Sequence, residues 1–308
     1  MTQPSNPPFA SKLPPMCNAW ILLSEDDPAG TYYNSPASAF QRLISEGLYQ
    51  ANDIINLCFV DIVPTSSKTV PAGDGSSYTL FLDKVTHPVD AEGPTDQDYM
   101  EWIIRDARKA NPHIKICLTL LYHKQHLISQ IYKDPDHPDQ ASADAFAQNV
   151  VTYLKHYGLD GFDIDWEWDY LSDDTTQAQF KTTFSAVGPA LKAAGMLLTM
   201  CPATTNNLDP DTVNEHFDII AFQMYSSTSL PGDFVAIKIR PDAFAYGAKF
   251  EAPDHSTPHG AGVQTATEAF EQMQLYGFKA VTTWRLNSEN YITEQDQQLA
   301  LSKLVKGS

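Results

Sequence analysis

Short apolar runs alternate along the chain with segments in which apolar residues recur at helical spacing. A short apolar run bounded by turn residues is typical of a buried strand. Eight such runs occur, at residues 18–23, 54–60, 114–121, 161–166, 196–201, 218–225, 243–250 and 278–284. Strands that alternate with helices usually pair in parallel. Eight of them in a chain of this length predict a closed (β/α)8 barrel.

Turn residues mark the ends of the predicted helices. We expect Ser142 to cap one helix and Gly158 to end it just before the fourth strand, while Gly277 ends another before the eighth. The last helix is expected to open at Thr293, with an acid three residues later completing a capping box. Residues 233–239 offer a short helix in the weakly patterned stretch between the sixth and seventh strands.

An open, doubly wound sheet is the alternative fold. The glycine-rich phosphate loop that often follows its first strand is missing from the sequence, which favours the barrel. We expect a flexible, proline-rich arm at residues 1–15 and a single catalytic domain at 16–308.

Composition and charge narrow the classes of function. The chain has 308 residues, 43% of them hydrophobic, enough to bury a large core. Its 38 acidic and 20 basic residues give a formal net charge of −18, which repels nucleic acids and anionic membranes. No apolar run is long enough to span a bilayer, and the N-terminus lacks the pattern of a signal peptide. Both a cytoplasmic protein and a secreted one whose signal has been removed fit this pattern, and we expect a monomer.

The four cysteines lie inside apolar runs. Cys17, Cys58, Cys117 and Cys201 form no CxxC pair and have no histidine nearby in the sequence. This spacing does not suit a zinc site or a disulfide framework, so we expect four buried free thiols.

Five acidic residues crowd into the segment LDGFDIDWEWD at 159–169. Side chains alternate across a strand. The segment therefore has an acidic face and an apolar face, with Asp163, Asp165 and Glu167 on the first and Phe162, Ile164 and Trp166 on the second. In a barrel the acidic face points inward, and Glu167 comes last, at the end where barrels place catalytic groups. Buried carboxyl groups are costly unless they share protons, accept hydrogen bonds or react.

Two other interpretations of this segment are a solvated acidic edge strand and a Mg²⁺ or Ca²⁺ site. The apolar residues between the acids require burial of the opposite face, which disfavours the edge strand. Hard cations take several oxygen ligands, and no second acidic strand is apparent to supply them.

The stretch DGFDIDWE at 160–167 resembles the D-G-x-D-x-D-x-E motif of glycoside hydrolase family 18, which contains chitinases and endo-β-N-acetylglucosaminidases on a (β/α)8 barrel. A looser resemblance follows the strand order from residue 17 to 285. It implies that Glu167 is the general acid that protonates the glycosidic oxygen. Asp165 would orient the substrate's 2-acetamido group, and Asp163 would hold and tune Asp165. In this family the acetamido carbonyl attacks the anomeric carbon, so the resemblance implies neither an enzyme nucleophile nor a cofactor.

Two further stretches resemble the family. Gln223 and Tyr225 match the Q-x-Y of short plant-type chitinases, whose tyrosine hydroxyl holds the acetamido oxygen. Alternation along the strand places both on the inward face. Trp284 matches the last-strand tryptophan that forms the floor under the cleaved sugar. A structural role in the core is the alternative for each aromatic residue.

The third predicted strand departs from the family pattern. It ends T-L-L-Y at 119–122, where the family usually has S-x-G-G. Thr119 can still offer a hydroxyl to Asp163. Leu121 in place of glycine narrows the floor of the substrate cleft, and a leucine here is closer to the pattern of the endo-β-N-acetylglucosaminidase branch. Ser226 stands where many chitinases carry Asp or Asn.

Loops at the catalytic end of the barrel supply the other candidates. The residues expected at the substrate are Trp284, Gln223, Thr119, Trp168 and Tyr122. Tyr32, Tyr33, His123, Asn206 and Asn207 also fall on these predicted loops, where ordinary loop surface is the alternative. Residues 251–277 are too few for the α+β insertion that deepens the groove of processive chitinases, so we expect a more open cleft.

The resemblance to glycoside hydrolase family 18 implies a metal-independent hydrolase that cleaves β-1,4 bonds next to N-acetylglucosamine with retention of configuration. Chitin or chitooligosaccharides are the expected substrates, and the chitobiose core of N-glycans is the alternative. A chitin- or glycan-binding lectin without hydrolytic activity is the rival from another class, and the presence of Glu167 argues against it.

Overall fold

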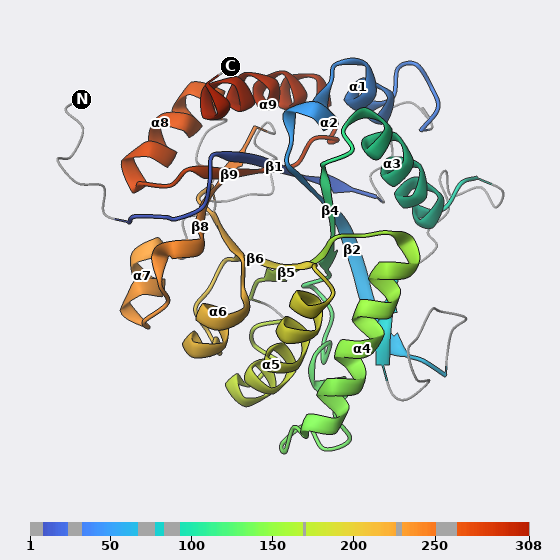
Figure 1. Cartoon of the computed structure of the whole chain (residues 1–308), viewed down its shortest axis with the longest axis vertical. Helices are drawn as coiled ribbons and strands as arrows, with labels where there is room; N and C mark the ends of the chain where they lie inside the picture. Colours follow the sequence, from blue (N-terminus) through green and yellow to red (C-terminus); the bar gives the residue numbers. More distant parts are fainter. Residues whose placement is uncertain are drawn as a thin grey trace.

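The computed structural model describes residues 9–23, 33–66, 78–82, 93–168, 171–225, 230–250 and 264–307. Eight parallel strands close into a barrel surrounded by helices (Figure 1). The barrel strands are β1 (Met16–Leu22), β2 (Ile54–Pro64), β4 (Lys115–Leu120), β5 (Gly161–Trp166), β6 (Leu197–Pro202), β7 (Ile219–Gln223), β8 (Phe244–Lys249) and β9 (Ala280–Trp284). The sheet closes because β1 pairs with both β2 and β9. The predicted (β/α)8 barrel is confirmed, and the open-sheet alternative is wrong.

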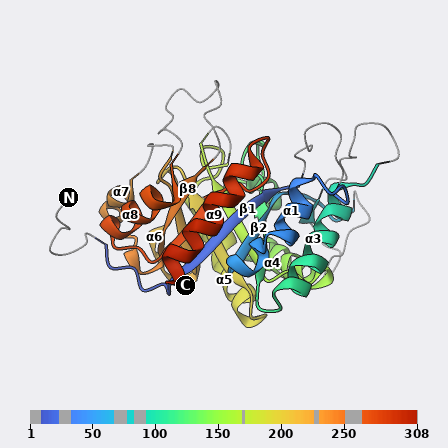
Figure 2. The ribbon, with the colours of Figure 1, turned by 90° about the horizontal axis from the view of Figure 1, so that it is seen from above.

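The outer layer of the barrel is helical. Its helices are α1 (Ala39–Ser45), α2 (Leu48–Ala51), α3 (Asp96–Ala110), α4 (Gln140–Tyr157), α5 (Gln177–Ala193), α6 (Pro210–His216), α7 (Pro231–Ala236), α8 (Ala266–Tyr276) and α9 (Tyr291–Lys306), with 3-10 turns η2 (Ser129–Ile131) and η3 (Pro241–Ala243). In Figure 2, α9 crosses in front of β1, against which it packs. α7 fills the stretch in which one short helix was expected. Between β8 and β9 the described residues form α8, and they form no α+β insertion domain there.

One described strand was not predicted. β3 (Tyr78–Phe81) pairs antiparallel with the last residues of β2, which run on past the barrel. β3 is held to α4, where Asn149 Nδ2 donates to the Tyr78 carbonyl at 2.8 Å. A four-residue strand gives too short an alternation to be recognised, and its partner is an overhang whose length the sequence does not reveal.

The cap of α4 corrects the expectation for Ser142. The helix begins at Gln140, and the N-cap is Asp139, whose carboxylate accepts from the backbone N of Ser142 at 2.9 Å. Ser142 is therefore inside the first turn, where its backbone N and its hydroxyl both donate to the Asp139 carboxylate. Gly158 and Gly277 do end α4 and α8, with left-handed φ angles of 69° and 80° that glycine adopts without strain.

The start of α9 also differs from the prediction. The helix begins at Tyr291, two residues before Thr293, and the expected capping box is wrong. Glu294 is fully buried and bonds back to the hydroxyl and the backbone N of Ser288. Asp296, the expected partner of Thr293, instead forms an ion pair with Arg42 on α1 at 2.7 Å.

The core between barrel and helices is rich in aromatic residues from the outward faces of the strands. Trp166 on β5 packs edge-on against Phe180 of α5 at a centroid distance of 5.0 Å. Phe222 on β7 packs against Phe234 of α7 at 4.8 Å. Burial of each large side chain contributes about 1.5–3 kcal/mol relative to exposure. Since these side chains face outward, their neighbours on the same strands face the barrel interior.

Residues 9–15 run against the barrel. The backbone N of Phe9 donates to the carbonyl of Tyr276 at 3.2 Å, and the two rings stack at 6.3 Å. Lys12 forms an exposed ion pair with Asp242 at 2.7 Å. The domain boundary at residue 16 stays a prediction.

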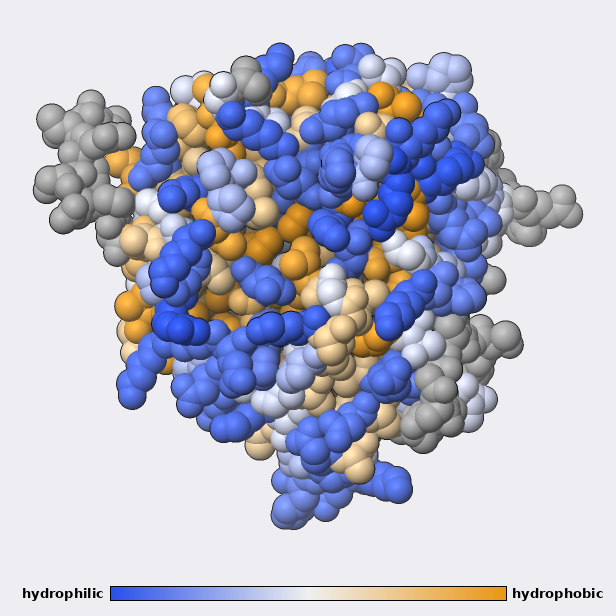
Figure 3. Space-filling model, viewed as in Figure 1, coloured by the Kyte–Doolittle hydropathy of each residue, from blue (hydrophilic) through white to orange (hydrophobic). Residues whose placement is uncertain are grey.

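Hydrophilic and hydrophobic side chains are distributed as the composition predicts for a chain with a large core. Hydrophilic residues cover most of the face seen in Figure 3, and hydrophobic residues gather near its centre. No helix in the described residues is long and apolar enough to cross a membrane. All four cysteines are free and buried, as the sequence predicts.

Candidate active site

The carboxylates of β5 lie inside the barrel. The exposed fractions of Asp163 and Asp165 are 1% and 4%, and Glu167 follows just after the strand, partly buried. Gly161 makes this arrangement possible, because a Cβ there would stand 2.7 Å from Sγ of Cys117 and 2.8 Å from the Leu197 carbonyl oxygen. The division into an inward acidic face and an outward apolar face is confirmed.

Asp160, the first acid of the motif, belongs to the opposite end of β5. Its carboxylate accepts from Arg108 at 2.7 Å, from Lys115 at 3.3 Å and from the backbone N of Ile116 at 2.9 Å. Asp160 therefore fastens β5 to α3 and β4, at a distance from the acids that follow it.

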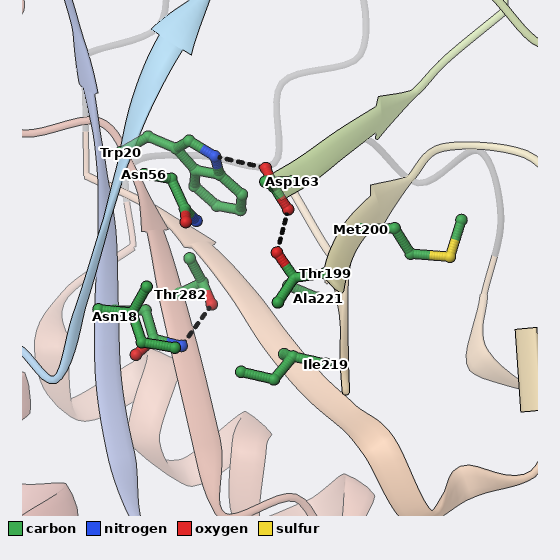
Figure 4. A pocket seen from close by; sticks show the side chains of 10 residues that line it. Asn18, Trp20, Asn56, Asp163, Thr199, Met200, Ile219, Ala221 and Thr282 are labelled. Atoms are coloured by element: carbon green, nitrogen blue, oxygen red, sulfur yellow. Dashed lines mark hydrogen bonds between the residues drawn. The ribbon is translucent and has the colours of Figure 1, made fainter. Parts of the chain in front are cut away.

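Asp163 is held by three side-chain donors, two of which, Trp20 and Thr199, are drawn in Figure 4. Trp20 Nε1 and Thr119 Oγ1 donate to its Oδ2 at 3.2 and 3.0 Å, and Thr199 Oγ1 donates to its Oδ1 at 2.6 Å. Burial raises the pKa of Asp163, while these hydrogen bonds act to lower it. The expected hydrogen bond from Thr119 to Asp163 is present. Because Thr119 is fully buried, its role is to hold Asp163, and it is not exposed to contact a substrate directly.

Asp165 and Glu167 form a connected pair. Gln223 Nε2 lies 3.3 Å from Oδ1 of Asp165 and 2.6 Å from Oε1 of Glu167, and the Cys201 thiol donates to the same Asp165 oxygen at 3.1 Å. Burial, followed by the charge of Glu167, holds the pKa of Asp165 well above its usual value. Because the charge on one carboxyl group disfavours ionisation of the other, the two groups titrate as a coupled pair.

Tyr225 follows β7 at the same end of the barrel. Burial raises the pKa of its hydroxyl well above the usual value, and charges on Cys201, Glu167 and Asp165 add to the effect. The hydroxyl therefore stays protonated and can donate a hydrogen bond at any pH at which the protein functions.

Aromatic rings line the same end of the barrel. Trp284 at the end of β9 lies 6.1 Å from Trp20 and 6.3 Å from Phe59, measured between ring centroids. Phe59 in turn meets Tyr122 edge-on at 6.0 Å. The guanidinium of Arg285 lies 5.8 Å from the Trp284 ring centroid. Trp284 and Tyr122, predicted from separate strands, thus belong to one aromatic cluster.

Tyr33 corrects one expectation. Its ring is fully buried and packs on Phe40 of α1 at 5.2 Å, and its hydroxyl donates to Asp106 of α3 at 2.9 Å. Tyr33 therefore anchors α1 to α3 and cannot stack on a sugar. The apolar contacts of α1 and α3 draw the ring inward, which the sequence of a loop does not reveal. Tyr32 and Ser226 lie outside the described residues.

The other described loop candidates are exposed. Trp168, directly after Glu167, has an exposed fraction of 43%. His123 is exposed beside the ring of Tyr122. Asn206 and Asn207 are exposed but also hold the loop after β6, and Asn207 Nδ2 donates to the Ser172 carbonyl at 2.8 Å.

Three residues in contact with the acids escaped the sequence analysis: Trp20, Thr199 and Cys201. Strand register explains two of them, since Thr199 is the β6 partner of Asp163 and Cys201 that of Asp165. Alternation within residues 196–201 could have placed both side chains inward. The register between that strand and the acidic strand then places Thr199 next to Asp163 and Cys201 next to Asp165.

The described residues contain no group of three or more His, Cys, Asp or Glu side chains that could hold a metal ion. Both carboxylate oxygens of Asp163 already accept hydrogen bonds from O–H and N–H donors. This arrangement suits an acid–base site better than a Mg²⁺ or Ca²⁺ site.

The chain matches a family model described as Glycosyl hydrolases family 18 over residues 31–285. The chain belongs to this family. Its acidic motif lies within the matched residues, so the family resemblance at Glu167 and the whole-domain match agree. A comparison with curated proteins finds no match.

Solved structures of chitinases and of a chitinase-like agglutinin have the same fold. A chitinase from Flavobacterium johnsoniae is 13% identical with a TM-score of 0.61, covering 96% of this chain and 94% of its own. A chitinase from Bacteroides thetaiotaomicron is 17% identical, with a TM-score of 0.60 and coverages of 96% and 98%. A chitinase-like agglutinin from Robinia pseudoacacia is 10% identical, with a TM-score of 0.60 and coverages of 94% and 98%. The fold is therefore shared by chitinases and an agglutinin.

Proposed function

We propose that this family 18 protein is a retaining glycoside hydrolase that cleaves β-1,4 bonds next to N-acetylglucosamine by substrate-assisted catalysis. Chitin or chitooligosaccharides are its proposed substrates. The observation that carries the proposal is the bridged pair of Asp165 and Glu167, joined by Gln223 at the carboxyl end of the barrel.

Glu167 is the proposed general acid. It is the partly exposed member of the pair, whereas Asp165 is almost fully buried. A proton held between them can be delivered from Glu167 to the glycosidic oxygen. The raised pKa of Asp165 favours retention of that proton by the pair.

Asp165 and Tyr225 are the proposed partners of the 2-acetamido group. A carboxylate at Asp165 accepts the acetamido N–H and directs the carbonyl oxygen toward the anomeric carbon. Its negative charge then stabilises the oxazolinium ion as positive charge develops there. The Tyr225 hydroxyl, which stays protonated, donates to the acetamido oxygen. Asp163, which lies deeper in the barrel on the same face of β5, is proposed to hold Asp165 in place.

Trp284, Tyr122 and Trp168 are the proposed sugar contacts. The first two belong to the aromatic cluster beside the acids, and the third is exposed next to Glu167. Aromatic faces pack well on the apolar faces of sugar rings.

The alternative substrate is the chitobiose core of N-glycans. Leu121 in place of the family's glycine favours it. The connection between β8 and β9 also favours it, because residues 250–279 are too few for the α+β insertion and an open cleft accommodates a branched glycan.

A non-hydrolytic lectin is the rival from another class, and one structure with this fold is described as an agglutinin. The acid is in place here and is bonded to Gln223 at 2.6 Å, which argues for hydrolysis.

The test is to incubate the protein separately with chitotetraose and with a high-mannose glycoprotein, and to identify released sugars by mass spectrometry. Chitobiose from the first supports a chitinase. A free glycan ending in one N-acetylglucosamine from the second supports the alternative. No release from either, with retention on insoluble chitin, supports the lectin. Glu167→Gln is the matched variant and should bind while releasing nothing. Near-normal turnover by that variant would refute the mechanism, and loss of turnover in EDTA would refute metal independence.

A further inference from the structure

A small cavity lies inside the barrel beneath Asp163, on the side toward the beginning of the strands (Figure 4). Its volume is about 10 Å³, which is the space required by about one water molecule. Its polar wall consists of Asn18, Asn56, Asp163, Thr199 and Thr282. Isoleucine and alanine side chains close it on the β7 side.

Two of the residues that line this cavity, Asn18 and Asn56, have amide oxygens without a hydrogen-bond partner among the described residues. The exposed fractions of Asn18 and Asn56 are 2% and 5%, and among the described residues no donor reaches either Oδ1. The two residues are diagonal neighbours on β1 and β2, since Asn56 is the register partner of Trp20. Burial of an amide oxygen without a hydrogen bond is unfavourable, so a donor is required between the strands.

The chemistry of the wall selects the donor. A water molecule has two O–H groups for the two amide oxygens, and internal waters typically make about three hydrogen bonds. The third partner is Thr282, whose Oγ1 accepts from Asn18 Nδ2 at 3.5 Å and whose hydrogen can point into the cavity. A cation fits less well, because Asp163 already accepts from three side chains and the available oxygens are too few.

We propose that this cavity binds one internal water molecule that donates to Asn18 Oδ1 and Asn56 Oδ1 and accepts from the Thr282 hydroxyl. The water completes a polar layer directly below Asp163. Two of the donors to Asp163, Trp20 and Thr199, also line the cavity, so the water would lie beside the residues that hold this carboxylate.

The direct test is a high-resolution crystal structure of the unmodified protein. We expect one isolated density peak about 2.7–3.2 Å from both amide oxygens. Magnetic relaxation dispersion of water ¹⁷O should detect the same molecule as long-lived. No peak and no long-lived water would overturn the proposal. A peak with five or six shorter oxygen contacts would identify a cation and would also overturn it.

A double-mutant cycle tests the bridge in solution. Asn18→Leu or Asn56→Leu alone leaves the other amide oxygen buried without a donor, and should lower the midpoint of thermal unfolding by about 2–10 °C. In the double variant both oxygens are gone, so the loss should be clearly smaller than the sum of the single losses. Strict additivity would count against a shared water. Asn149→Leu, at a buried asparagine of α4 outside the cavity, is the control and should retain the long-lived water.

A kinetic consequence rests on the proposed function. Asn56→Leu should lower kcat several-fold with little change in KM, because it removes one partner of the water in the cavity that Asp163 also lines, and Asn56 lies below the proposed sugar site. If the unmodified protein releases no sugar, the proposed function fails while the water is still judged from the crystal structure. If the protein is active and the water is missing, only the present proposal fails.

Discussion

The side-chain amide of Gln223 on β7 donates a 2.6 Å hydrogen bond to Oε1 of Glu167, which follows β5. The two strands are not neighbours, since β6 lies between them. The same nitrogen also reaches Asp165 at 3.3 Å, so a single amide holds both carboxyl groups in place. An amide donates at every pH, and it therefore positions the pair without taking the proton that they share.

Replacement of this amide should slow the reaction more than it weakens binding. We expect Gln223→Leu to lower kcat about 10²-fold, the range seen when one pre-positioned donor is removed, with a smaller change in KM. Steady-state kinetics on chitotetraose checks this. Gln264→Leu is a matched control, because Gln264 donates to the Tyr246 hydroxyl away from the acids. Equal effects of the two substitutions would indicate that Gln223 is merely structural.

Cys201 offers a second, milder change at the same pair. Its thiol donates to Asp165 and so favours the ionised carboxylate, against the effects of burial and of the charges on Glu167 and Asp163. Cys201→Ala removes this donor and should raise the pKa of Asp165 further. The acidic limb of the kcat/KM profile should then move to higher pH, whereas Cys201→Ser should keep a donor and move it little. Cys17→Ala removes a buried thiol outside the barrel interior as a control. Identical profiles for the alanine and serine variants would contradict this role.

The barrel and the three acids could be predicted because both depend on local pattern. Apolar runs fixed the eight strands, and alternation within one strand fixed the inward direction of Asp163, Asp165 and Glu167. The same rule also placed Gln223 inward. No information beyond the order of residues was needed for these features, since a side chain two positions away always shares the face.

The contacts of the acids required pairing between strands. Trp20 and Thr199 reach Asp163 from β1 and β6, which are separated from β5 by long stretches of sequence. Their register follows from the closure of the whole sheet, so no single segment reveals it. Tyr33 shows the converse, because its burial depends on the apolar faces of α1 and α3 and not on the loop sequence around it.

Trp284 should contribute to sugar binding. We expect Trp284→Ala to raise KM for chitotetraose about tenfold, which corresponds to about 1.4 kcal/mol of lost contact energy. Isothermal titration with the Glu167→Gln variant as background measures the same change without turnover. Trp102→Ala is the control, since Trp102 packs with Tyr33 and Tyr99 in the helical layer and should alter stability alone. An unchanged affinity in Trp284→Ala would assign this tryptophan to the core.

The buried charge of Asp165 should make stability depend on pH. Its pKa in the folded protein is well above the ordinary value of 3.8 because of burial and the charge of Glu167. The folded state therefore binds more protons than the unfolded state between these two values. The stability linked to this group is fully present below about pH 3.8 and is lost as the pH rises through the folded pKa. The asparagine in Asp165→Asn does not titrate. As the pH rises toward neutral, the thermal midpoint of this variant should therefore increase relative to that of the unmodified protein.

Thermal unfolding of both proteins between about pH 4 and pH 8 measures this difference. Asp144→Asn, on the exposed side of α4, corrects for the loss of one charge. We expect Asp165→Asn to be the more stable protein at neutral pH and at the same time the less active one. A carboxyl group retained in the barrel at a cost in stability is expected only where it takes part in function. Parallel pH curves for Asp165→Asn and the unmodified protein would show that this carboxyl group carries no such cost.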